Sequence, residues 1–111
     1  CLVGSEMCIR DRDDTVATAA MTRSKEIEKS FSHTRPDGRN FGTAITDLGI
    51  TYRGAGENIA WGQKTPEAVM NAWMNSEGHR ANILNPNFKK LGVGYRTDSQ
   101  RTPYWTQLFT Y

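Results

Sequence analysis

The sequence lacks the features that mark membrane proteins and nucleic-acid binders. No apolar run approaches the roughly 18 residues that a helix needs to cross a bilayer. The formal net charge is only +2, and lysine and arginine are scattered along the chain rather than clustered in one basic stripe. We therefore expect a soluble protein that has no membrane span and no nucleic-acid partner.

Cysteine is nearly absent as well. Cys1 and Cys8 are the only two in the chain, and residues 13–111 contain none. The first twelve residues, CLVGSEMCIRDR, have neither a start methionine nor the charged and apolar regions of a secretory signal. They resemble the translated read-through of a sequencing adapter, so we interpret residues 1–12 as a non-native leader. A disulfide within this tail would indicate nothing about the redox compartment of the domain.

The remaining segment, residues 13–111, is long enough for one hydrophobic core but not for two. Hydrophobic residues make up 37% of the chain and charged residues 23%, which is typical of a globular protein. We therefore expect a single domain.

Three segments carry helical signals. The first runs from residue 13 to about residue 30 and has one face formed by Val16, Ala20, Arg23, Ile27 and Phe31. The second runs from residue 40 to residue 48 and is stopped by Gly49. The third starts at residues 65–67, Thr-Pro-Glu, which suit the cap, the first turn and the dipole of a helix. Its predicted inner face consists of Val69, Ala72, Trp73 and Ser76.

Extended segments alternate with these helices. Residues 50–53 and 57–61 are short and are separated by glycines at positions 54 and 56. Residues 91–97 and 104–111 alternate between inward and outward side chains, which predicts an antiparallel pair. Helices on both sides of such a pair would give a layered α+β domain.

Three polar segments, each broken by glycine or proline, carry one group that can move a proton or bind a metal. They hold His33, Glu57 and His79, and the two histidines are the only ones in the chain. We hypothesise that the three side chains line one solvent-connected cleft. Two imidazoles and a carboxylate can support metal-assisted hydrolysis. However, the domain has no HExxH motif, no nucleophile elbow and no cysteine nucleophile, so no motif demands an enzyme.

The same residues also have purely structural explanations. His33 lies beside a Pro-Asp-Gly turn and can be a surface histidine, whereas His79 can bond a backbone carbonyl at a helix end. Glu57 can simply begin a strand. We interpret three tryptophans as core aromatics rather than sugar platforms, and four basic residues as solvated charges. These are Trp61, Trp73 and Trp105, and Arg35, Arg80, Lys89 and Lys90.

Four blocks carry a family resemblance: FSHTRPDGR, AGENIAWG, AWMNSEGHRANILNPNFKKLGVGY and YWTQLF. In this order they resemble the signature blocks of the CAP superfamily, or SCP domain, and most closely its cysteine-free bacterial branch. That superfamily includes cysteine-rich secretory proteins, antigen 5 allergens and plant pathogenesis-related proteins. The resemblance covers residues 13–111 and implies an α-β-α sandwich with a central antiparallel sheet. The family's first helix would precede residue 13, which implies that the domain is truncated at its N-terminus.

The resemblance also implies a site. In the family, two histidines and two acidic residues line a central cavity, and His33, Glu57 and His79 match three of these four positions. The fourth falls on Ser76, and the adjacent Glu77 would be turned away by about 100° on a helix. We include Asn58, next to Glu57, among the cleft residues.

Some family members hold a divalent ion on the two histidines. By this resemblance Zn²⁺ or another divalent cation would bind His33 and His79, and the fold would not depend on it.

For function, the resemblance implies a secreted or cell-surface module. We rank first a monomer that binds a lipid, glycan or peptide through the His/Glu cleft, outside the cell or at its envelope. A metal-assisted, peptidase-like hydrolase ranks second. A structural domain of the cell envelope, which needs no chemistry, ranks third.

Overall fold

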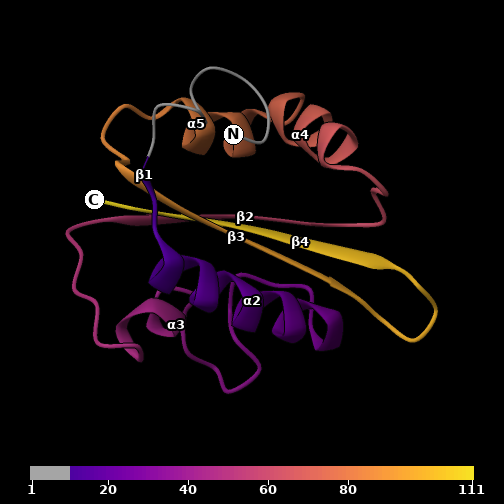
Figure 1. The fold of residues 1–111 in the computed structure, drawn as a ribbon, viewed down its shortest axis with the longest axis horizontal. Coiled ribbons are helices and arrows are strands. Elements are labelled where there is room, and N and C mark those ends of the chain that lie inside the picture. The colour runs from indigo at the N-terminus through magenta and orange to yellow at the C-terminus, as the bar shows by residue number, and fades with distance from the viewer. Residues whose placement is uncertain (1–10) are drawn as a thin grey trace.

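The protein folds into three layers (Figure 1), and the computed structural model describes residues 11–111. In chain order the elements are β1 (Asp11–Arg12), α2 (Asp14–Lys29), α3 (Thr43–Thr46), β2 (Ala55–Trp61), α4 (Pro66–Met74), α5 (Glu77–Leu84), β3 (Lys90–Thr97) and β4 (Pro103–Thr110). The sheet lies between α2 and α3 on one side and α4 and α5 on the other. This architecture confirms the predicted α-β-α sandwich of the α+β class.

The four strands are ordered β1-β3-β4-β2. β3 and β4 form the predicted antiparallel pair, in a register that runs from Lys90 opposite Thr110 to Thr97 opposite Pro103. β2 pairs antiparallel with the other side of β4 and forms one edge of the sheet. Because helices cover both faces, β4 is buried at all but one of its positions, so its alternating pattern does not separate an inner from an outer face.

The expected leader, residues 1–12, lies outside the described residues except for its last two. Asp11 and Arg12 form β1, which pairs parallel with Lys90 and Leu91 of β3. These two residues therefore extend the sheet by a short edge strand. The part of the fold that the structure describes thus includes two residues that we had assigned to the leader.

The helix α2 begins and ends close to its predicted bounds. The side chain of Asp13 caps it by accepting hydrogen bonds from the backbone amides of Thr15 (2.9 Å) and Val16 (3.0 Å). Four of the five residues of the predicted inner face are buried, but Phe31 lies beyond the end of the helix and is exposed. The inner face is lined with alanines, and a side chain at Gly92 or Gly94 of β3 would collide with the α2 backbone. These small residues let the helix lie directly on the sheet.

The segment between α2 and α4 departs from its prediction. The second helix covers only residues 43–46 of the expected 40–48, although Gly49 does follow it with a left-handed φ of +85°. Residues 50–53 form no strand, and β2 runs without interruption through Gly56. A side chain at Gly56 would meet the ring of Phe88 at 2.9 Å, so glycine serves packing there rather than ending the strand.

The helix α4 starts as predicted, with Thr65 accepting a hydrogen bond from the amide of Ala68 at 3.1 Å. Val69 and Trp73 face the sheet, but Ala72 is exposed. The polar segment around His79, which was not among the predicted helices, forms a separate helix, α5. No helix within residues 11–111 is long and apolar enough to cross a membrane.

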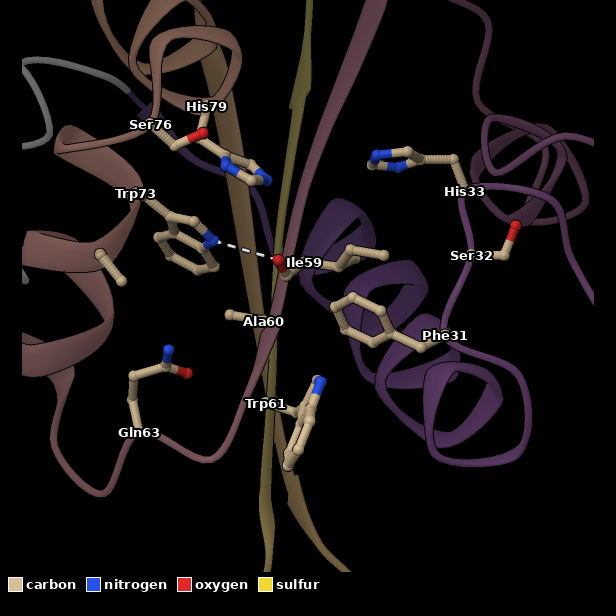
Figure 2. A pocket seen from close by; sticks show the side chains of 11 residues that line it. Phe31, Ser32, His33, Ile59, Ala60, Trp61, Gln63, Trp73, Ser76 and His79 are labelled. Atoms are coloured by element: carbon tan, nitrogen blue, oxygen red, sulfur yellow. Dashed lines mark hydrogen bonds between the residues drawn. The ribbon is translucent and has the colours of Figure 1, made fainter.

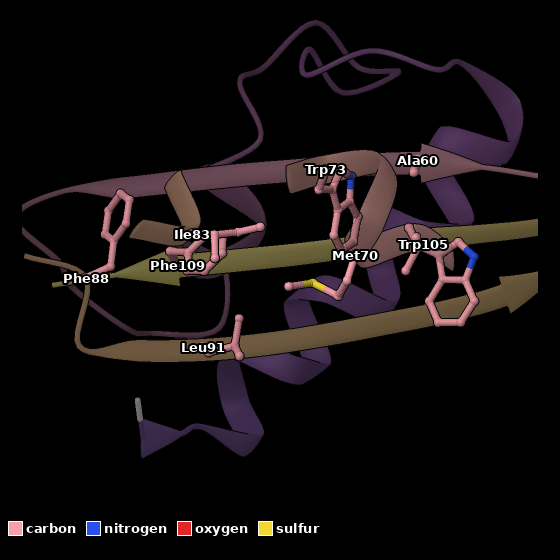
Figure 3. Packing of buried hydrophobic residues seen from close by; sticks show 9 residues of the cluster. Ala60, Met70, Trp73, Ile83, Phe88, Leu91, Trp105 and Phe109 are labelled. Atoms are coloured by element: carbon pink, nitrogen blue, oxygen red, sulfur yellow. The ribbon is translucent and has the colours of Figure 1, made fainter. Parts of the chain in front are cut away.

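Two buried clusters hold the layers together. The first lies between the sheet and α4 and α5, and it contains Trp73 and Trp105 as predicted (Figure 3). The second lies under α2 and consists of small and aliphatic side chains. Trp61 belongs to neither cluster and is 57% exposed, so its assignment to the core was wrong. It is the last residue of β2, past the five buried positions of that strand.

Candidate functional site

The structure brings His33, Glu57 and His79 to one pocket at the β2 edge of the sheet. Its volume is about 340 Å³, and its other lining residues are Ser76, Gly78 and Asn82. His33 comes from the loop after α2, Glu57 from the middle of β2 and His79 from α5. The two imidazoles point toward each other from opposite sides of β2 (Figure 2). Three segments remote in sequence therefore meet at one opening.

Glu57 is buried, and its two carboxylate oxygens are fully engaged. Nε of Arg23 donates to Oε2 at 2.6 Å, and Nη2 of the same guanidinium donates to Oε1 at 3.1 Å. Burial opposes the charge of Arg23, but the hydrogen bonds to Glu57 and Glu26 outweigh it and raise the pKa of the guanidinium. This two-point pairing fixes the position of the carboxylate at the base of the pocket.

His33 is held by the same carboxylate. Its Nδ1 lies 2.7 Å from Oε1 of Glu57, and because a carboxylate only accepts, the imidazole donates this hydrogen bond. Nε2 is then the ring nitrogen that remains for a ligand. The side chain is 57% exposed, so that nitrogen is accessible from solvent. The buried carboxylate thus orients an exposed histidine through this hydrogen bond.

His79 has no comparable partner. Its Nδ1 is buried, and no group within residues 11–111 forms a hydrogen bond with it. Burial lowers the pKa of His79 below its ordinary value of 6.5, and the nearby His33 lowers it further. His79 is consequently a neutral imidazole at pH 7, with a nitrogen that can bond a ligand.

The predicted cleft residue Asn58 does not line this pocket. Its Nδ2 donates to the backbone oxygen of His79 and to Oε1 of Gln107, both at 3.1 Å, and its Oδ1 accepts from Nδ2 of Asn82 at 3.0 Å. Asn58 therefore fastens α5 to the sheet. Asn82 does line the pocket and was missed, although it lies three residues after His79 and would have shared its face had a helix been predicted.

The position that matches the family's fourth cleft residue is occupied by Ser76. Ser76 lines the pocket, whereas Glu77, the first residue of α5, is exposed and does not. The pocket therefore has a hydroxyl at the position where the family pattern has a second acid.

A network of charges behind the pocket overturns one expectation. Arg35, expected to be solvated, is only 9% exposed. It donates to both carboxylate oxygens of Glu26, which also accepts from Arg23, and to Asp47 at 3.1 Å. These acids compensate its charge and tie the His33 loop to α2. The other three basic residues expected to be solvated, Arg80, Lys89 and Lys90, are exposed.

A wider groove of about 450 Å³ continues from the pocket along β2 (Figure 2). It shares His33, Ser76 and His79 with the pocket, and its far end includes Phe31 and Trp61. The site therefore has a polar end and an aromatic end.

The residues present limit any metal site. Within residues 11–111 no three His, Cys, Asp or Glu side chains are grouped so that they could hold an ion. Glu57 is already paired with Arg23 and His33, so the donor set consists of two imidazoles. Such a set fits a weakly bound divalent cation that takes its other ligands from solvent.

Comparison with known sequences places these features in a family. The profile of the CAP family, described as the cysteine-rich secretory protein family, matches residues 11–109. Uncharacterized protein YkwD of Bacillus subtilis is 48% identical over 99 residues, which are 87% of this chain and 37% of that protein. Uncharacterized membrane protein YlbC of the same species is 32% identical over 99 residues, 87% of this chain and 27% of that protein. The chain spans about a third of the length of these curated relatives.

Solved structures show the same fold. An extracellular protein of Bacillus anthracis that contains an SCP domain superposes with a TM-score of 0.82 at 34% identity, over 91% of this chain and 33% of that one. An outer surface protein from Borrelia burgdorferi also reaches 0.82, at 22% identity, over 91% and 76% of the two chains. At the latter identity the likeness concerns the fold alone.

Proposed function

The chain belongs to the CAP family, and from this premise we propose that it is a binding module whose ligand occupies the pocket between His33 and His79. The observation that carries the proposal is the unpartnered Nδ1 of His79, buried at the wall of an open pocket. A buried polar atom without a partner costs free energy, and a bound ligand that supplies a hydrogen bond would recover it.

The other groups of the pocket are arranged to support binding. Glu57 and Arg23 neutralise each other, so the base of the pocket adds no unpaired charge. His33 is oriented before any ligand arrives, because its Nδ1 is fixed by Glu57. Preorganised groups lose little freedom on binding, which favours affinity. Nothing in this arrangement requires a bond in the ligand to break.

We further propose that the domain acts outside the cell or at the cell envelope. The Bacillus anthracis relative, 34% identical, is described as an extracellular protein. The proposal extends that description to this chain.

A metal-assisted hydrolase is the second candidate, and one contact favours it. A carboxylate that accepts from one nitrogen of a histidine leaves the other nitrogen oriented for a metal, as Glu57 does for His33. A bound divalent ion would supply a Lewis acid to a substrate in the pocket. His33 and His79 would hold it, and Arg23 would keep Glu57 in place.

The binding proposal is tested by following the imidazole resonances of His33 and His79 by NMR during titration with lipid, glycan and peptide probes. We expect a binding probe to shift both resonances and to lose affinity in His79→Ala. Arg80→Ala is the matched control, since Arg80 is the exposed neighbour on the same helix. Binding that leaves both resonances unchanged, or that survives His79→Ala, would place the ligand elsewhere.

The metal candidate is tested by calorimetric titration with Zn²⁺ at about pH 7.5 and about pH 5.5, on either side of the ordinary histidine pKa. We expect weak binding at the higher pH, loss at the lower pH and loss in His79→Ala, with the fold intact. If the wild type takes up no zinc at the higher pH, the hydrolase candidate fails and the binding module stands.

A further inference from the structure

The aromatic end of the groove is unusually exposed for such large apolar side chains. Trp61 is 57% exposed and Phe31 is 48% exposed, and both line the groove. The same two residues also line a smaller adjoining pocket together with Tyr104. Aromatic rings therefore flank the path of any ligand that extends from the histidines along β2 (Figure 2).

The groove is also free of ionic groups. None of its lining residues is an aspartate, glutamate, lysine or arginine, although such residues make up 23% of the chain. A fatty acid, a phosphorylated headgroup or a charged peptide would find no counter-charge there. A charged ligand would lose its hydration in the groove without gaining a counter-charge, and a neutral ligand avoids this cost.

Two residues that line the groove each carry a polar atom without a hydrogen-bond partner. Oε1 of Gln63 is buried and forms no hydrogen bond with any group of residues 11–111, and the same holds for Nδ1 of His79. The backbone oxygen of Gln63 is held by Nε1 of Trp105 at 2.8 Å, which fixes the position of this residue. A ligand hydroxyl or amide group can bond either atom, because the oxygen of Gln63 accepts and a ring nitrogen of neutral histidine either donates or accepts.

An added peptide strand fits the edge of β2 poorly. Gly54 exchanges both backbone hydrogen bonds with Tyr111 of the β4 side, so in the antiparallel register the backbone of Glu57 and Ile59 faces outward. The oxygen of Glu57 already accepts from Asn82, and that of Ile59 from Nε1 of Trp73, both at 3.3 Å. A strand docking there would compete with these side chains for its acceptors.

From these observations we propose that the groove binds a neutral oligosaccharide. One sugar ring lies on Trp61, and hydroxyl or acetamido groups of the oligosaccharide bond to Gln63 and His79. The C–H face of a pyranose ring is apolar and slightly positive, which suits the negative face of an indole. Its rim of hydroxyls suits neutral donors and acceptors. The inference rests on the proposed binding function and specifies the ligand class.

The test uses tetrasaccharides of glucose and of N-acetylglucosamine at up to about 10 mM, a concentration that detects millimolar affinity. The three tryptophans give three indole N–H signals in a ¹H–¹⁵N spectrum, which single Trp→Phe variants assign. We expect a saccharide to shift the Trp61 signal and the His79 imidazole together. Trp61→Ala and Gln63→Ala are each expected to weaken binding about tenfold or more.

Tyr111→Ala is the matched control, because Tyr111 is an aromatic residue of similar exposure, 46%, that lies outside the groove. It is expected to bind saccharide as the wild type does. Thermal unfolding of each variant separates loss of binding from loss of fold.

Three outcomes would overturn the inference. The first is that no saccharide shifts the Trp61 signal, and the second is that Trp61→Ala binds as tightly as Tyr111→Ala. In the third, palmitate or a proline-rich peptide shifts the His79 imidazole while the saccharides do not. That result would leave the binding function standing and remove only the saccharide.

Discussion

The two faces of the sheet are packed by different means. On the side of α4 and α5, large rings fill the space: Trp73, Phe88, Trp105 and Phe109 belong to one cluster, and Phe88 stacks on Phe109 with 5.4 Å between ring centroids. On the side of α2, alanines lie against glycines of β3, and the largest buried side chain is Arg23. One face is a conventional apolar core, and the other combines close backbone contact with buried charge.

This difference shows how the site is built. His79 is carried by the helix that packs on the aromatic cluster, whereas His33 and the carboxylate of Glu57 are fixed by Arg23 from the other side. The pocket lies where the two layers extend past the edge strand β2. We therefore expect changes on the aromatic face to act on stability, and changes on the charged face to act on stability and site geometry together.

The largest effect is expected from Trp73→Ala on the aromatic face. Trp73 is 2% exposed, and truncating a buried tryptophan costs about 3–5 kcal/mol of unfolding free energy. Urea unfolding measures the loss. The control Trp61→Ala, at an exposed position, is expected to change stability by no more than about 0.5 kcal/mol. Similar losses in the two variants would contradict the assignment of Trp61 to the groove and Trp73 to the core.

A loss of similar size is expected from Arg23→Met on the charged face. Removing one partner of a buried ion pair leaves Glu57 uncompensated, at a cost of about 3–5 kcal/mol. The double variant Arg23→Met/Glu57→Met removes both charges and is expected to be more stable than the single variant. Urea unfolding of the set tests this, and additive losses would show that the pair itself is not the source of the cost.

A smaller effect is expected where α2 lies on the sheet. In Gly94→Ala the new methyl group would collide with the backbone of Ala20, and such overpacking costs about 1–3 kcal/mol. The control Gly78→Ala adds the same methyl group in α5 where no atom lies within 4 Å, and it is expected to stabilise by up to about 1 kcal/mol. Thermal melts of both variants decide the matter, because the predicted changes have opposite signs.

The smallest effect concerns pH and His79. Its pKa is lower in the folded protein than in the unfolded chain, so the unfolded state binds more protons as the pH falls below about 6.5. This contribution to stability is therefore complete above that pH and is lost as the pH falls through the folded pKa. Because the ring is partly exposed, we expect less than about 1 kcal/mol. Urea unfolding at several pH values in this range gives the unfolding free energy as a function of pH. This free energy should depend less steeply on pH in His79→Gln than in the wild type, and an identical dependence would exclude His79 as the source.

Local signals determined the parts of the fold that depend on neighbouring residues. The Asp13 cap, the Thr65-Pro66 start of α4 and the alternation in β3 and β4 all lie in short stretches of sequence, and each produced the expected element. The site residues His33, Glu57 and His79 were selected from the sequence because polar segments around glycine and proline stand out from periodic ones. The resemblance to the CAP family then matched all three residues to positions of one central cavity.

Tertiary packing decided which side chains are buried, paired or exposed, because local sequence patterns do not determine this. Arg23 and Arg35 are buried only because Glu57, Glu26 and Asp47 converge on them from segments distant in sequence. Trp61 is exposed because it lies at the end of β2, past the five buried positions of that strand, and Asn82 lines the pocket because α5 continues past His79. Whether a side chain is buried, paired or open to a ligand depends on which elements lie beside it, and strand order and helix placement are set by the free energy of the whole core.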